Sequence, residues 1–513
     1  MKPTVRRWLI IIAGVVLIAG AVLFGVLSLF VPRYVRARAA RALGERFDSN
    51  VQFAGLRISV FPRIAITGDG LVLRKKGDAD EPPLIRIGKF SAASSLLDLL
   101  RRPHHVEMVR LEGLRITVPS RRNQEPHPSK KGHYFPVVVD QIISTDAALV
   151  IMSKDETKPP RVFVIRHLIL HNAGRGLAVP FTAMLMNPVP VGEIETQGEF
   201  GPWPNEHPAL TPVKGTYTFL NADLGTIHGL GGILSSKGSF NGVLERINVD
   251  GETDTPNFSL SFSHHPLPLE TRFHAVVDGT NGNTFLDPVR ARIGSSTLIA
   301  KGGAFRTTDT KGRTVILDVT ADKARLDDLL RLAVKADQPP LSGLGNFKVR
   351  MRIPPGKSDI TNRLNLNGEF NVRAAHFREA AVQGKVDSLS RRGRGKPRDS
   401  AAADVASNLK GRFTLQNGVM TFRNLEFRVQ GASIHLRGNY NLNNEQLDFR
   451  GALRLEAKIS QTTTGWKSIL LKPLDPFFKK GKAGTSLPIK VTGTEKNPSF
   501  GVDIGRALTR RSE

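Results

Sequence analysis

Apolar and polar residues alternate along most of this chain with a period of two residues. In the segments 258–263 and 364–372, the apolar side chains fall on one face, and the other face carries mainly serine or asparagine. Successive side chains of a β-strand point to opposite faces, so such segments predict antiparallel strands with one apolar and one polar face. We therefore expect a mainly β protein whose sheet has a single apolar face.

The C-terminal part of the chain shows the most regular alternation. Strands are expected over 411–415, 425–429, 434–442 and 447–455, with a hairpin turn at Gln416-Asn417-Gly418. The Asn-Gly pair favours a type I′ turn, because both residues tolerate a positive φ. These segments predict a meander of three or four strands with one continuous apolar face.

Shorter alternating runs follow residue 50. Strands are expected over 51–60, 63–67, 71–74 and 106–118, and Gly68-Asp69-Gly70 separates the second from the third. Turn residues between runs of period two are typical of an antiparallel meander. We therefore expect a tight turn at these glycines.

Three segments have helical spacing instead. A short helix is expected over 92–102, capped by Ser94 or Ser95, and a second over 322–334, where leucines form one stripe. In 464–480, aromatic residues and lysines lie close together. This last segment is either a helix that caps the sheet or an amphipathic helix in a membrane interface.

The longest apolar segment is 8–30, which carries no charged residue over 23 positions. As a helix it would extend about 34 Å, enough to cross the hydrocarbon core of a bilayer. A buried core helix and a cleaved signal peptide are alternatives, but core helices usually have a polar face and signal h-regions span about 7–15 residues. We expect an uncleaved membrane anchor that includes Trp8, Leu17, Phe24 and Phe30.

A basic segment follows this anchor. The segment 34–47 is expected to be a helix, either with an ordinary solvated face or with its arginines among lipid headgroups. The candidate headgroup contacts are Arg33, Arg36, Arg38 and Arg41. Basic residues flank the anchor on both sides, so the positive-inside rule does not decide its orientation.

Composition limits the classes of partner. The chain has 513 residues, no cysteine and a net charge of +27. Its length predicts several domains or one elongated body, and the lack of cysteine excludes disulfides and cysteine-ligated metals. The positive charge favours polyanions, and beside a membrane anchor we expect anionic lipid and no nucleic acid, because no nucleic-acid-binding module is recognisable. The segment 388–404, rich in arginine, glycine, alanine and serine, is expected to be a disordered basic excursion.

Catalytic signatures are missing from the sequence. It contains no HExxH, GxSxG, GxGxxG or P-loop motif. The pairs His104-His105 and His264-His265 are poor chelates, because neighbouring side chains on a strand point to opposite faces. We expect a protein that is not an enzyme and has no catalytic residue, metal or cofactor, although a site assembled from distant residues would leave no motif.

The order of motifs along the chain resembles the AsmA family. The shared features are the anchor with its basic helix, the segment 59–64 leading into 71–74, the glycine-punctuated meander from Gly411, and 487–494 followed by Asn497-Pro498. The resemblance implies an inner-membrane anchor with the body in the periplasm. It also implies an elongated, curved antiparallel sheet with a few capping helices, whose hydrophobic groove carries phospholipid between the inner and outer membrane and so supports outer-membrane biogenesis.

The resemblance implies a division of the chain and a set of lining residues. The expected parts are a cytosolic tail and anchor (1–31), an N-terminal AsmA-like β domain (32–230), a middle β-groove region (231–387), the basic excursion (388–404) and a C-terminal AsmA-like β domain (405–513). The candidate groove-lining residues are apolar positions of alternating segments: Phe258, Leu260, Phe262, Leu364, Leu366, Phe370, Ile434, Leu436, Leu447, Phe449 and Leu453.

Alternation by itself leaves two structures open. The apolar faces either stay accessible as a trough or close on each other as the core of a dry sandwich. Two other functions also stay open. One is a non-catalytic assembly factor that binds outer-membrane proteins or other envelope proteins through its sheet edges, and the other is an envelope hydrolase.

Overall fold

The computed structural model of the chain is mainly β, as the alternation predicted. It describes residues 49–59, 63–75, 82–95, 98, 104–118, 137–151, 161–174, 176–202, 204, 207–261, 263, 265–306, 312–334, 338–356, 358–399, 404–462, 484–494 and 497–502. These residues form two compact units. Unit 1 comprises the described residues within 1–226, 234–252 and 275–282, and unit 2 those within 227–233, 253–274 and 283–513.

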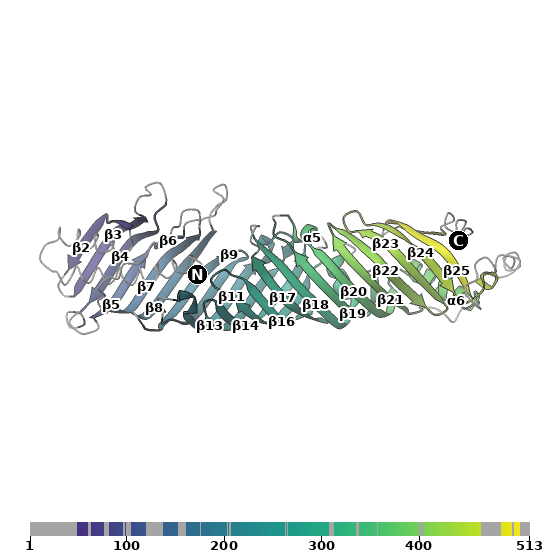
Figure 1. Cartoon of the computed structure of the whole chain (residues 1–513), viewed down its shortest axis with the longest axis horizontal. Helices are drawn as coiled ribbons and strands as arrows, with labels where there is room; N and C mark the ends of the chain where they lie inside the picture. The colour runs from purple at the N-terminus through teal and green to yellow at the C-terminus, as the bar shows by residue number, and fades with distance from the viewer. Residues whose placement is uncertain are drawn as a thin grey trace. The chain divides into compact units, whose positions relative to one another are not determined.

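Unit 1 consists of strands and two short 3-10 helices (Figure 1). They are β1 (Ser49–Gln52), β2 (Gly55–Ser59), β3 (Ile64–Lys75), β4 (Ile85–Ser94), β5 (His104–Glu112), β6 (Arg115–Val118), β7 (Val137–Ile151), β8 (Arg161–Gly174), β9 (Val179–Pro188), β10 (Val191–Phe200), η2 (Pro208–Leu210), β11 (Pro212–Asp223) and η3 (Leu224–Thr226). The strands β13 (Ile233–Val243), β14 (Arg246–Leu260) and β15 (Leu267–Val277) contribute residues to both units.

Unit 2 combines strands with three α-helices (Figure 1). Its elements are β12 (Leu230–Gly231), β16 (Thr284–Ile293), β17 (Ser296–Arg306), β18 (Arg313–Arg325), α4 (Leu326–Ala333), β19 (Leu341–Ile353), α5 (Ile360–Arg363), β20 (Asn365–Phe377), α6 (Ala380–Gly393), β21 (Ser407–Gln416), β22 (Val419–Val429), β23 (Ala432–Asn441), β24 (Gln446–Leu455), η4 (Ile459–Thr462), β25 (Thr485–Thr494) and β26 (Pro498–Val502).

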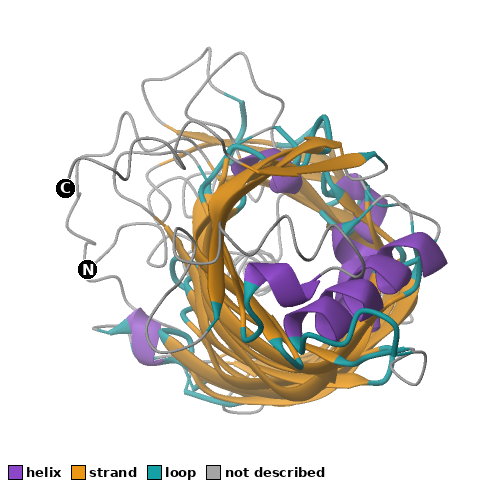
Figure 2. Cartoon of the chain, turned by 90° about the vertical axis from the view of Figure 1, so that its right-hand side faces the viewer, coloured by secondary structure: helices purple, strands orange, loops and turns teal. Residues whose placement is uncertain are grey.

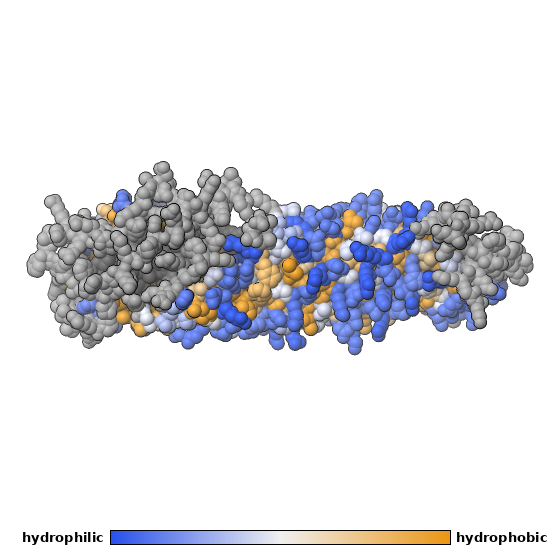
Figure 3. Space-filling view, in the orientation of Figure 1, coloured by the Kyte–Doolittle hydropathy of each residue, from blue (hydrophilic) through white to orange (hydrophobic). Residues whose placement is uncertain are grey.

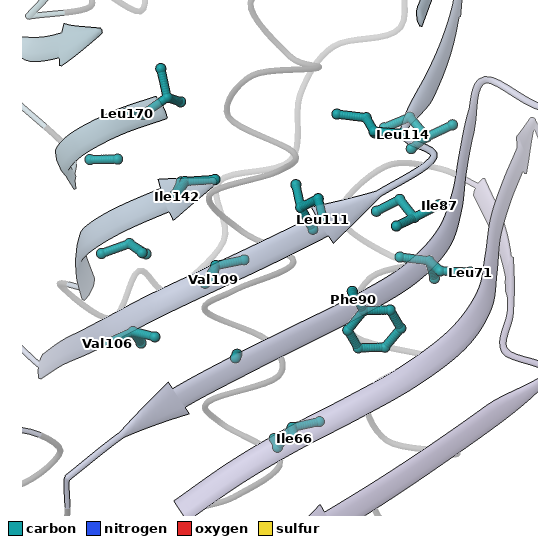
Figure 4. Packing of buried hydrophobic residues seen from close by; sticks show 14 of the residues in the cluster. Ile66, Leu71, Ile87, Phe90, Val106, Val109, Leu111, Leu114, Ile142 and Leu170 are labelled. Carbon is teal, nitrogen blue, oxygen red and sulfur yellow. The ribbon is translucent and has the colours of Figure 1, made fainter. Parts of the chain in front are cut away.

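Unit 1 contains a buried apolar cluster on one face of its sheet. Strand β7 runs parallel to β5 and β6, whereas β3–β4, β7–β8, β8–β9, β9–β10 and β10–β11 are antiparallel pairs. The pairing aligns Val109 with Ile142, and Ile142 with Leu170, and Figure 4 shows such side chains next to one another on neighbouring strands. Leu71 and Val106 are fully buried in this cluster.

The segment 63–74 differs from its prediction, because the turn expected at Gly68-Asp69-Gly70 does not occur. Strand β3 continues through these residues and pairs with β4 on both sides of them. Gly70 has φ +63°, yet the register with β4 is the same on both sides of it, with Asp69 opposite Lys89 and Leu71 opposite Ile87. The glycines therefore lie within one continuous strand instead of separating two.

Every strand from β16 to β26 pairs antiparallel with the next strand along the chain. The predicted hairpin turn is confirmed, because β21 ends at Gln416, β22 begins at Val419, and Asn417 and Gly418 have φ of 51° and 73°. Positive φ at both central residues is the signature of a type I′ turn. The predicted C-terminal meander is likewise present as β21 to β24.

The helix expected over 322–334 begins later than predicted. Helix α4 starts at Leu326, because β18 continues to Arg325 and pairs with Leu344 of β19. Leu326 and Leu330 pack against β20 residues that include Val372. Asp328 at the start of α4 accepts hydrogen bonds from the Ser295 amide (2.9 Å) and the Ser296 hydroxyl (2.8 Å). These contacts fix α4 to the β16–β17 turn at one end of the strands.

The prediction of a disordered basic excursion at 388–404 is wrong for 388–393, which belong to a helix. Helix α6 extends to Gly393 and packs on the sheet through Val386 and Leu389, on the inner side of the curled strands (Figure 2). The Ser390 hydroxyl donates to the Gln430 carbonyl at 2.8 Å. A Cβ on Gly393 would collide with the carbonyl oxygen of Gly431 in the β22–β23 turn, so glycine permits this close approach. The basic composition concealed the few small and apolar residues that anchor the helix.

The helix expected over 92–102 also begins later. Residues 92–94 belong to β4, and the Ser94 hydroxyl donates to the His105 carbonyl at 2.8 Å. The amide of Asp98 donates a hydrogen bond to the Ser95 hydroxyl at 3.1 Å. This is the bond that the side chain of an N-cap residue accepts from the first turn of a helix. Of the two predicted caps, Ser95 therefore has the capping geometry.

Other predicted elements fall outside the described residues. They are the anchor 8–30, the basic segment 34–47 and the aromatic segment 464–480. Among the residues that the structure describes, no helix is both long and apolar enough to span a bilayer.

Asp387 should be the residue that holds α6 in place. Its carboxylate accepts hydrogen bonds from the amides of Val405 (2.9 Å) and Asp404 (3.0 Å) and from the Gln383 side chain (2.9 Å). Burial by itself would raise the pKa of Asp387, but these hydrogen bonds and the charge of Arg391 outweigh it and lower the pKa below its ordinary value. Charged hydrogen bonds of this kind contribute about 1.5–3 kcal/mol each.

We predict that Asp387→Asn increases hydrogen exchange at the amides of Asp404 and Val405 by about tenfold to a hundredfold. Because the folded pKa is lowered, the stabilisation is complete above the unfolded pKa of about 3.9 and is lost as the pH falls through the folded value. The exchange rates of these two amides in the wild type should therefore approach those in the Asp387→Asn variant only at acid pH. Asp448→Asn, at an exposed carboxylate, is the control; equal exchange in all three proteins would contradict the assignment.

Candidate functional site

The register of unit 2 aligns its apolar side chains into four rows that cross the strands on one face. We call this surface the apolar face. The first row is Val372, Leu409, Phe427, Ile434, Leu453 and Leu487, and the second is Leu298, Ala321, Phe347, Phe370, Leu425, Leu436 and Ile489. The third row is Ala300, Val319, Val349, Phe413, Phe422, Phe449 and Val491, and the fourth is Leu317, Met351, Leu366, Leu415, Met420, Tyr440 and Leu447. Each row continues from strand to strand, so the apolar face is continuous across unit 2.

Most side chains of the apolar face are only partly buried. Phe413, Phe422 and Leu366 are of intermediate exposure, whereas Leu415 and Phe449 are 4% and 6% exposed. This differs from unit 1, where several large side chains of the apolar cluster are 0–1% exposed. A continuous apolar surface that is only partly buried is a candidate for contact with another apolar group.

The opposite face of the same strands is charged. Arg350 pairs with Asp318 at 2.7 Å and Lys301 with Asp287 at 2.8 Å, and all four side chains are more than half exposed. Such exposed pairs add little stability, but they keep this face in water. Unit 2 therefore has one face for water and one for apolar contact. Figure 3 shows apolar residues in streaks between polar ones on the side in view.

Helices α4 and α6 lie at one end of the apolar face. Phe427 and Leu453 adjoin the buried cluster that contains Val386 of α6, and Phe347 and Phe370 adjoin the one that contains Leu326 of α4. These residues belong to the two rows at the same end of the strands. The rows that include Phe413 and Leu366 lie farther along the strands. Helices α4 and α6 therefore leave those two rows as the part of the face best placed to receive a ligand.

Aromatic rings run across the centre of the apolar face. Phe413 lies 6.2 Å from Phe370 and 6.1 Å from Phe422, measured between ring centroids, and Phe422 lies 5.7 Å from Phe449. We call these four residues, from β20 to β24, the aromatic strip. The separations fall in the range in which aromatic pairs stabilise each other.

The predicted lining residues divide into three groups. Seven lie on the apolar face: Leu366, Phe370, Ile434, Leu436, Leu447, Phe449 and Leu453. Leu364 precedes β20, and Phe258 and Leu260 lie near the end of β14, where Leu260 pairs with Leu230 of β12. Phe262 lies outside the described residues, as do the anchor residues Trp8, Leu17, Phe24 and Phe30 and the arginines Arg33, Arg36, Arg38 and Arg41.

Sequence reasoning missed several members of the apolar face. Phe413 and Phe422 belong to the aromatic strip, and Met351 and Leu415 flank Leu366. Phe422 and Leu425 have opposite parity in the sequence, yet a register shift between them places both on this face. The consecutive polar pair Arg423-Asn424 inside an alternating run is the signal that could have indicated this bulge.

A pair of hydroxyl groups lies within unit 1. Tyr217 of β11 pairs across the strands with Thr196, which in turn pairs with Ala183, a buried residue. The Tyr217 hydroxyl lies 3.2 Å from the Ser236 hydroxyl, which donates to the Glu252 carbonyl. Burial raises the pKa of Tyr217, and the hydrogen bond with Ser236 opposes that rise. The phenol therefore stays neutral and offers hydrogen bonding without charge.

The shifted acidic groups of unit 2 have structural partners. A hydrogen bond from Arg292 lowers the pKa of Glu270, and one from Arg350 lowers that of Asp318. Acids held ionised by arginines suit ion pairs better than general acid catalysis. Among the described residues, no group of three or more histidine, aspartate or glutamate side chains is placed to hold a metal ion.

Comparisons with models of known families, with curated proteins and with solved structures gave no match for this chain. The functional argument therefore depends on the apolar face itself.

The partial exposure of the apolar face can be measured with thiol chemistry, because the chain has no cysteine. We predict that Leu366→Cys reacts with a small maleimide within about tenfold of Asn367→Cys, its exposed neighbour on the opposite face. Leu71→Cys, at a fully buried position, should react at least about a hundredfold more slowly.

Protection of Leu366→Cys equal to that of Leu71→Cys would mean that this face is closed. Thermal unfolding of each variant serves as the control for folding.

Proposed function

We propose that this protein is an AsmA-like lipid carrier that holds phospholipid acyl chains on the apolar face of unit 2. The observation that carries the proposal is the continuity of this partly exposed surface from β17 to β25. A dry sandwich core would bury the same rows. Their intermediate exposure supports the trough over the sandwich.

The energetics suit this function. Each methylene group of an acyl chain that leaves water gains about 0.8 kcal/mol, so a lipid in an apolar trough avoids most of the cost of crossing an aqueous space. The face presents carbon atoms at every row and few directional partners. An acyl chain can therefore move from one row to the next without breaking specific bonds, as lipid transport requires.

Attachment to a membrane completes the proposal. The uncharged segment 8–30 would anchor the chain in the inner membrane, and the AsmA-like order of motifs supports a body in the periplasm. Lipid carriage requires no bond to be made or broken, so it needs no catalytic residue or cofactor. The proposed role is phospholipid transfer between the inner and outer membrane in support of outer-membrane biogenesis.

Photocrosslinking of the full chain in cells tests this function. We predict that a benzoylphenylalanine at Leu366 gives a phospholipid adduct detectable by mass spectrometry of the purified protein. The same group at Asn367, on the charged face of the same strand, should give at least about fivefold less adduct, because side chains i and i+1 point to opposite faces.

A second arm uses Met351→Lys, which places a charge beside Leu366 and should reduce the adduct at that position. Equal adduct yields at Leu366 and Asn367, or crosslinks to β-barrel precursors without lipid, would overturn lipid carriage. The second result would support an assembly factor instead.

A further inference from the structure

Two glycines of the apolar face lie beneath aromatic rings of the adjacent strand. A Cβ on Gly411 of β21 would lie 2.8 Å from two ring carbons of Phe370 of β20. A Cβ on Gly368 of β20 would lie 2.8 and 2.9 Å from ring carbons of Phe413 of β21. The register places Phe370 opposite Gly411 and Gly368 opposite Phe413. Each ring therefore occupies the space that a side chain on the facing residue would fill.

This exchange has a geometric consequence for the face. An aromatic side chain normally stands away from a sheet, because a Cβ on the opposing strand blocks its path to the backbone. Where that residue is glycine, the ring can fold down onto the backbone instead. The aromatic strip then covers the sheet with apolar carbon and projects less far above it. A glycine–aromatic pair thus sets how much space remains over the apolar face.

The same arrangement recurs within unit 1, which indicates a repeated feature of these sheets. A Cβ on Gly68 would collide first with the ring of Phe90, as at Gly368 and Gly411. At Gly215 and Gly238 a Cβ would meet a backbone carbonyl oxygen before it met the rings of Phe240 and Tyr217. Glycine in a strand costs about 0.5–1 kcal/mol relative to alanine. Its use beneath the ring of Phe90 implies a steric requirement that outweighs this cost.

We propose that Gly368 and Gly411 keep the aromatic strip flat, and that the strip, from Phe370 through Phe413 and Phe422 to Phe449, is an acyl-chain binding site. This inference rests on the proposed lipid function. It assigns a specificity-determining role to Gly368 and Gly411, which are both buried. A straight acyl chain fits along the flattened strip, whereas raised rings would obstruct it.

The test uses the full chain with benzoylphenylalanine at Leu366, in cells. Gly411→Ala and Gly368→Ala should each lower the phospholipid adduct at Leu366 by about fivefold or more, because the added Cβ would collide with the ring of Phe370 or Phe413 and displace it. Gly384→Ala is the matched control, because a Cβ at this α6 position would have no neighbour within 4 Å, and it should leave the adduct unchanged.

Removal of the displaced ring should recover part of the loss. In the Gly411→Ala, Phe370→Leu double variant, adduct yield should exceed that of Gly411→Ala by at least about twofold, a non-additivity expected of residues in contact. It should stay below the wild type, because the strip has lost one of its rings. Relief of the clash could also restore folding, so the fold of each variant is checked separately. Circular dichroism of each purified variant checks this independently.

The possible failures are distinguishable. A wild type without phospholipid adduct at Leu366 would overturn the proposed function and this inference with it. A wild type that forms the adduct, together with Gly411→Ala and Gly368→Ala variants that form it equally well, would overturn only the role of the glycines. Loss in Gly411→Ala without recovery in the double variant would also overturn that role.

Discussion

Backbone hydrogen bonding between consecutive strands fixes which side chains share a face, and the rest of unit 2 depends on that register. Because side chains alternate, a slip of one residue in any pair would transfer a whole set of apolar residues to the charged side. The type I′ turn at Asn417-Gly418 helps to hold the register of β21 and β22. Charged pairs such as Arg350–Asp318 on the other face add a penalty for slipping, because a slip would turn them toward the apolar side.

Irregularities in the strands serve the same arrangement. The shift between Phe422 and Leu425 keeps both residues on the apolar face. The helices complete the face at one end. Asp328 ties α4 to the β16–β17 turn, and Asp387 ties α6 to the backbone just before β21. Polar bonds at the ends of the strands thus position elements whose apolar sides cover only part of the face.

Much of this fold follows from the sequence, and its exceptions have physical causes. Alternation with period two predicted the strands and their single apolar face, and Asn417-Gly418 predicted its turn. Propensity could not distinguish a turn from a continuous strand at Gly68-Asp69-Gly70, because glycine tolerates the backbone of both. Composition suggested disorder after Ser388, since a basic segment gives no sign that Val386 and Leu389 pack against distant strands. The aromatic strip was missed for a similar reason, because its members belong to different strands and meet only through the register.

The pairing of each strand from β16 to β26 with its immediate successor has a consequence for how such a protein is made and how it changes in length. A hairpin can dock on the preceding strand as soon as it leaves the ribosome, so assembly needs no segment that is still to be synthesised. Gain or loss of a hairpin would alter the extent of the sheet while leaving the earlier contacts intact, much as in repeat proteins. The reach of such a body can therefore evolve in hairpin-sized steps.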